Sequence, residues 1–71
     1  MEYTLEQLIE AKRQIVSILH KIRETITTLE SKENISRYKS QITLANRRID
    51  AFIIAIELID QEITNYTLFI K

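Results

Sequence analysis

Residues 30–36, ESKENIS, form a polar break near the middle of the chain and decide between two helical folds. Apolar side chains at helical spacing run up to this break and resume directly after it. One uninterrupted helix would continue a seven-residue repeat across the break. The step from Leu29 to Ile35 is instead six residues, so an unbroken heptad would place Ser36 in the core. The sequence therefore predicts an antiparallel two-helix hairpin rather than one long rod.

The chain before the break is predicted to be a helix over about residues 4–30. Thr4 and Gln7 have the spacing of a capping box, in which each side chain bonds the backbone N–H of the other residue. Tyr3 can pack against Leu8 across this cap. From there apolar residues recur at steps of three and four, which is the period of a helix with one buried face.

After a turn at about residues 31–35, a second helix is predicted over about residues 35–70. Its apolar residues alternate steps of three and four without a miss, which is a heptad seam typical of a coiled coil. We therefore expect one all-α domain, residues 1–71, with a coiled-coil-like core between its helices. The expected core residues are Leu8, Ile15, Ile18, Ile22 and Leu29 of the first helix and Ile35, Ile42, Ile49, Phe52, Ile56 and Ile63 of the second.

Both helices carry more apolar surface than one neighbouring helix covers. Ile9 and Val16 widen the apolar face of the first helix, and a second apolar stripe runs about 140° around from the seam of the second. A chain of 71 residues buries only about 60% of its unfolded surface, and without cysteine it has no disulfide to reinforce it. We therefore expect self-association into a helical bundle, most simply a dimeric four-helix bundle. The expected oligomer interface consists of Ile9, Val16, Leu44, Ala51, Ile54 and Leu58.

The charges give a weaker indication of a partner. Ten lysine and arginine residues balance ten aspartate and glutamate residues, so no net charge attracts nucleic acid or an acidic membrane. In architecture alone, the expected hairpin resembles the plasmid copy-control family, whose dimeric helical hairpins bind paired RNA loops. A solvated basic face is the simpler interpretation, which makes nucleic-acid binding the lesser alternative. The basic residues that would contact phosphate are Lys21, Arg23, Lys39, Arg47 and Arg48.

The sequence offers few groups for catalysis or metal binding. His20 and Glu24 share a helix face, but a metal site needs three or four ligands and the chain has neither a second histidine nor a cysteine. Phosphate-binding loops need glycine, and the chain has none. We therefore expect no enzyme activity, no metal and no cofactor.

The remaining expectations concern location and role. The longest apolar run, Ala51–Ile56, is too short to span a bilayer, and the first residues are acidic where a secretory signal is basic, so we expect a cytoplasmic protein. Fourteen isoleucines against four alanines are typical of an AT-rich bacterial or phage genome. We expect a small non-catalytic structural or protein-interaction module that homo-oligomerises. The alternative is an adaptor or chaperone-like partner that binds an amphipathic helix of another protein.

Overall fold

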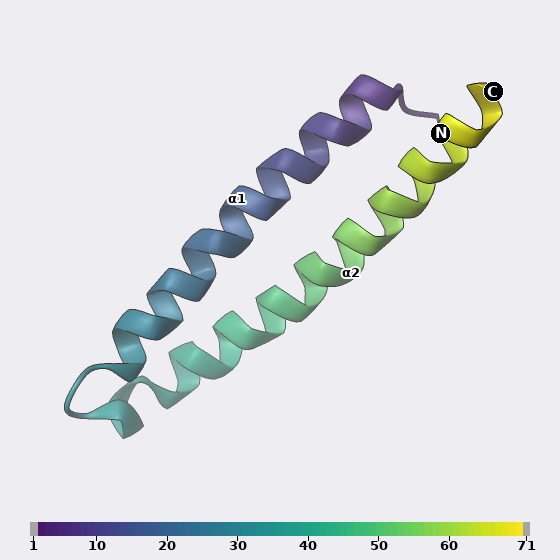
Figure 1. Cartoon of the computed structure of the whole chain (residues 1–71). Helices are drawn as coiled ribbons and strands as arrows, with labels where there is room; N and C mark the ends of the chain where they lie inside the picture. The colour runs from purple at the N-terminus through teal and green to yellow at the C-terminus, as the bar shows by residue number, and fades with distance from the viewer. Residues whose placement is uncertain (1, 71) are drawn as a thin grey trace.

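The computed structural model describes residues 2–70, with side-chain exposure as far as Leu68. It consists of α1 (Leu5–Glu30), a short 3-10 helix η1 (Ile35–Tyr38) and α2 (Lys39–Ile70), and this described range contains no strand. The two long helices lie side by side and antiparallel, joined at one end by a turn (Figure 1). The prediction of an all-α fold is confirmed, and the helices pack as a hairpin.

The start of α1 is held by reciprocal hydrogen bonds between Thr4 and Gln7. The Gln7 N–H donates to Thr4 Oγ1 at 3.1 Å, and the Thr4 N–H donates to Gln7 Oε1 at 2.9 Å. Glu6 adds a negative charge in the first turn, where the helix dipole favours it. The predicted capping box is confirmed, and it satisfies two backbone N–H groups at this helix end.

The end of α1 is built from hydroxyl side chains instead of glycine. Thr25, Thr27 and Thr28 each donate a hydrogen bond to the carbonyl four residues earlier, at 3.0–3.1 Å. Bonds of this kind slightly weaken and bend a helix. Ser31 then donates its hydroxyl to the Thr28 carbonyl at 2.8 Å. No described residue has a positive φ, so the chain reverses here without the left-handed residue that glycine usually supplies.

The second helical segment starts as a 3-10 turn and becomes α-helical at Lys39. The Arg37 N–H donates to the Asn34 carbonyl three residues back, at 3.0 Å, and the Asn34 side chain makes no cap. A tighter turn rotates its side chains differently from the α-helix that follows. Ile35 therefore falls outside the seam of α2 and is 50% exposed, so its predicted place in the core is wrong.

The contact between the helices is narrow. Among the described side chains only Leu8 and Leu19 are buried, at 9% and 6% exposure. The other predicted core residues, apart from Ile18 and Ile35, are half-buried. Leu19, four residues after Ile15, takes the inward position that we predicted for Ile18, three residues after Ile15. Ile18 is 43% exposed, so its predicted place in the core is wrong. Both spacings are helical, and only the position of α2 selects between them.

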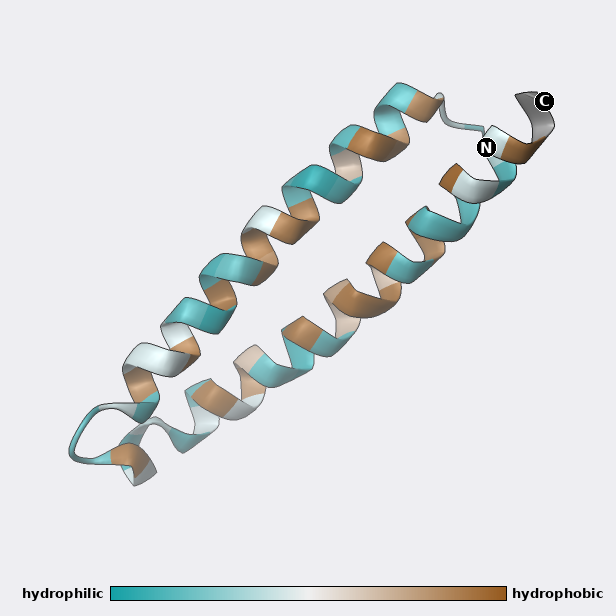
Figure 2. Ribbon diagram, viewed as in Figure 1, coloured by the Kyte–Doolittle hydropathy of each residue, from teal (hydrophilic) through white to brown (hydrophobic). Residues whose placement is uncertain are grey.

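The hairpin is long and thin. It measures 55 × 17 × 15 Å and has a radius of gyration of 16.2 Å, against about 11 Å for a compact chain of this length. Its accessible surface is 6014 Å², against about 4,600 Å² for a compact monomer of this mass. Hydrophobic residues recur along the whole length of both helices (Figure 2). One layer of two helices thus leaves apolar surface that a second layer would cover.

Candidate interaction surface

The predicted interface residues are all exposed in the hairpin. The five large ones range in exposure from 44% for Val16 to 59% for Ile54, and Ala51 is exposed as well. An exposed apolar side chain is common by itself, but a group of them marks a surface that can pack against another chain.

A salt bridge distinguishes the two long sides of the hairpin. Lys12 Nζ of α1 lies 2.7 Å from Asp60 Oδ1 of α2, and both side chains are partly exposed. The bridge therefore joins the helices along one side of their contact. We call that side the bridge edge and the opposite side the far edge. The same salt bridge shows how the two helices are aligned along their length, because residues near Lys12 lie beside residues near Asp60.

The exposed apolar residues of α1 lie on both edges. Ile9 and Val16 stand three residues before and four residues after Lys12, and this spacing places them on the bridge edge. Ile18 stands six residues after Lys12 and points about 120° away from it. The buried Leu19 lies between these two directions, so Ile18 is on the far edge. A predicted core residue is thus part of the outer surface.

The exposed apolar residues of α2 also separate. Leu44, Ala51 and Leu58 follow one another at intervals of seven and point about 160–180° away from Asp60, which places them on the far edge. Ile54 points outward, away from α1. The six predicted interface residues therefore divide between the two edges, with two on the bridge edge and three on the far edge. Ile54 lies on neither edge. The sequence alone could not show this division, because it depends on how one helix is rotated against the other.

The five predicted phosphate-contacting residues are exposed but do not gather on one face. Lys21 and Arg23 are two residues apart on α1 and point about 160° away from each other. Arg47 and Arg48 are neighbours on α2 and point about 100° apart. Lys39 lies at the first residue of α2, next to the turn. The fold brings these charges to the turn-side half of the hairpin without arranging them as one patch.

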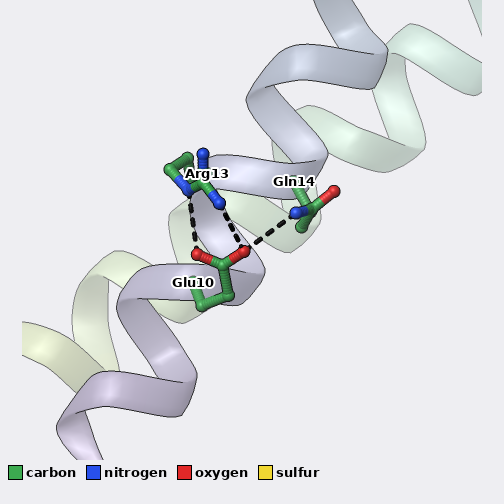
Figure 3. A network of polar contacts seen from close by, with 3 residues as sticks. All are labelled: Glu10, Arg13 and Gln14. Carbon is green, nitrogen blue, oxygen red and sulfur yellow. Dashed lines mark hydrogen bonds and ion pairs between the residues drawn. The ribbon is translucent and has the colours of Figure 1, made fainter.

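A local polar network lies on the first turns of α1 (Figure 3). Arg13 donates from Nε and Nη2 to the two Glu10 carboxylate oxygens at 2.8 and 2.7 Å, and Gln14 Nε2 donates to Oε1 at 2.8 Å. The Arg13 and Gln14 hydrogen bonds lower the pKa of Glu10 from its ordinary value of 4.5 to about 2. The hydrogen bond from Arg13 to Glu10 also raises the pKa of Arg13. All three residues are exposed and belong to one helix, so the network supports α1 locally.

Other polar groups of the hairpin show little convergence. His20 Nε2 lies 3.0 Å from Glu24 Oε1, on the exposed side of α1. Within residues 2–70, no three histidine, cysteine, aspartate or glutamate side chains are placed to hold a metal ion. A shallow, open depression is lined by Asp60, Gln61, Thr64 and Asn65. In the same range, neither helix has an apolar stretch long enough to cross a bilayer.

Comparison with known proteins adds no relative to this description. The chain matches no model of a protein family, no curated protein and no solved structure. The feature of the described surface that bears on function is its set of exposed apolar residues.

Proposed function

We propose that the hairpin is a small non-catalytic protein-interaction module that associates with itself, most simply as a dimeric four-helix bundle. The observation that carries this proposal is the shortage of buried residues. Ordering the backbone costs about 1–2 kcal/mol per residue, and only Leu8 and Leu19 are buried among the described side chains. A second hairpin would supply the missing layer of the core.

The size of the exposed surface supports the same proposal. Two separate hairpins expose twice 6014 Å², whereas a compact dimer of this mass would expose about 7,700 Å². Pairing would then remove up to roughly 4,000 Å² from water, which lies within the range of obligate dimer interfaces. Exposed apolar side chains such as Leu44 and Leu58, at 49% and 57%, provide apolar area for it.

The mass of the protein in solution tests the proposal. The chain mass is 8.4 kDa, so light scattering on a sizing column at micromolar concentration should give about 17 kDa for a dimer. The midpoint of thermal unfolding should also rise with protein concentration, because association stabilises the folded chain by mass action. A helical monomer at micromolar concentration, with a concentration-independent midpoint, would contradict self-association.

A second candidate function is that of an adaptor or chaperone-like partner. It is favoured by the placement of exposed apolar residues on opposite edges, since one pairing of hairpins covers only one edge. An amphipathic helix from another protein would then pack beside Ile9 and Val16. Co-purification from the native host tests this role, with Val16→Glu as the variant that should lose the partner. If the Val16→Glu variant keeps its partner, the adaptor role is contradicted.

Nucleic-acid binding is the lesser alternative, because the five basic residues do not share a face, and a mobility shift with mixed RNA tests it. The proposed role needs no catalytic step and no cofactor. A cytoplasmic location is proposed from the sequence, and fractionation of the native host tests it.

A further inference from the structure

The far edge of α2 carries a second heptad line in addition to the seam that faces α1. Its members recur at steps of four and three and lie about 100° around the helix from the inward seam. In a square four-helix bundle the directions to two neighbouring helices differ by about 90°. The line therefore points where a second neighbour of α2 would lie. It consists of Leu44, Arg48, Ala51, Ala55, Leu58 and Glu62.

The two charges on this line are placed symmetrically. Arg48 stands seven residues before Ala55 and Glu62 stands seven residues after it. If α2 packs antiparallel on a second copy of itself about Ala55, each Arg48 lies level with Glu62 of the partner subunit. A parallel pairing would place like charges opposite each other on both sides. Charge complementarity of this kind selects orientation, and here it selects the antiparallel one.

The centre of the line is suited to a close approach. Ala51 and Ala55 are the smallest residues on it, so two helices can come together there without large side chains between them. Leu44 and Leu58 flank this centre, and both are exposed. Small residues at the axis with leucines beside them permit the interdigitated packing of a coiled coil.

The far edge of α1 has an apolar residue at the same level. Ile18 lies six residues after Lys12, and Ala55 lies five residues before Asp60, so the salt bridge between Lys12 and Asp60 brings both to one height along the hairpin. A two-fold axis at this height would place Ile18 against Ile18 of the partner subunit. That contact would cover a residue that is 43% exposed in the single hairpin.

We propose that two copies pair face to face through their far edges, with α2 antiparallel to α2 of the other copy and the two-fold axis at the level of Ile18 and Ala55. This inference rests on the proposed self-association and adds its surface, orientation and register. The pairing leaves the bridge edge, with Ile9 and Val16, outside the interface. It also leaves Ile54 exposed.

Disulfide cross-linking of single-cysteine variants tests this arrangement, and the natural chain has no cysteine to interfere. Ala55→Cys should give a covalent dimer under mild oxidation, because its two copies meet at the axis. Leu44→Cys is the matched variant on the same line, eleven residues from the axis. Its two copies would be about 33 Å apart, whereas a disulfide needs Cα atoms within about 7 Å. Leu44→Cys should therefore remain uncrosslinked.

The outcomes separate the inference from the proposed function. The antiparallel pairing is supported if Ala55→Cys cross-links efficiently and Leu44→Cys does not. Equal cross-linking of both variants would overturn the orientation. A dimer by light scattering in which Ala55→Cys fails to cross-link, although its circular dichroism is that of the parent, would overturn the surface while self-association stands. A monomeric parent chain would overturn both.

Discussion

Lys12 and Asp60 connect α1 to α2 through a contact of 2.7 Å between Nζ and Oδ1. Both side chains are partly exposed, so this pair contributes at most about 1 kcal/mol to stability. Its value lies in what it reveals about the packing. It identifies one edge of the hairpin and the level at which the helices meet. Through it, the exposed apolar residues separate into those beside Lys12 and those on the opposite side.

The first prediction compares two exposed apolar residues of α2. Leu58→Glu should abolish the dimer, because it places a charge on the far edge within the proposed interface. Ile54→Glu should leave the dimer intact, because Ile54 points outward from the bundle. The two residues are alike in exposure, at 57% and 59%, so they form a matched pair. Light scattering measures the mass, and a dimer that survives Leu58→Glu would show that another surface mediates it.

The second prediction concerns the charges on the far edge. Arg48→Glu should weaken the dimer roughly fivefold or more, because two attractive pairs become two repulsive ones. The double variant Arg48→Glu with Glu62→Arg should regain most of the affinity, since it restores both pairs in reverse. Arg23→Glu, a charge reversal on α1 away from this line, serves as the control. Sedimentation equilibrium measures the dissociation constant of each variant. If the double variant does not regain affinity, the antiparallel pairing is contradicted.

The third prediction tests the interior of the hairpin. Leu19→Ala should lower the free energy of unfolding by about 2–4 kcal/mol, because Leu19 is 6% exposed and its removal leaves a cavity. Val16→Ala should cost well under half as much, since Val16 is 44% exposed and loses little contact. Urea titration at one fixed protein concentration measures both, because the stability of a dimer depends on concentration. Equal losses would mean that α1 is rotated differently.

The fourth prediction concerns the threonines at the two ends of α1. Thr4→Ala should lower the free energy of unfolding by about 1 kcal/mol, because the Gln7 N–H loses the Thr4 hydroxyl that caps it. Thr27→Ala should be neutral or slightly stabilising, since alanine has the higher helix propensity and the Thr27 hydroxyl only returns to the Arg23 carbonyl. Thermal unfolding followed by circular dichroism compares them. A larger loss for Thr27→Ala would contradict this account of the helix ends.

The fifth prediction concerns pH. The pKa of Glu10 is lowered from 4.5 to about 2 by its hydrogen bonds to Arg13 and Gln14. A lowered carboxyl pKa stabilises the folded state above pH 4.5, and this contribution is lost as the pH falls through about 2. Titration of the Glu10 carboxyl by nuclear magnetic resonance should show its midpoint well below the ordinary value of 4.5. The Arg13→Gln variant should move the Glu10 midpoint back toward 4.5, and an unmoved midpoint would exclude Arg13 as the cause.

Local features of this protein were predictable from the sequence. The helical period, the capping box of Thr4 and Gln7 and the reversal of the chain after Glu30 all depend on neighbours within a few residues. The exposure of the six predicted interface residues was also visible, because their helices carry more apolar surface than one partner can cover. Such features require only the spacing of side chains along one helix.

The rotation and level of the two helices were decided by the tertiary structure alone. Leu19 faces α2 and Ile18 does not, although both fit a helical stripe, because α2 packs along one direction only. Likewise, the opposite placement of Val16 and Leu58 follows from the contact that joins Lys12 to Asp60. The helical period shows which residues share a face of each helix. It does not show how each helix is rotated about its own axis against the other. Packing against a second helix removes that freedom, and with it determines which apolar residues remain for another chain.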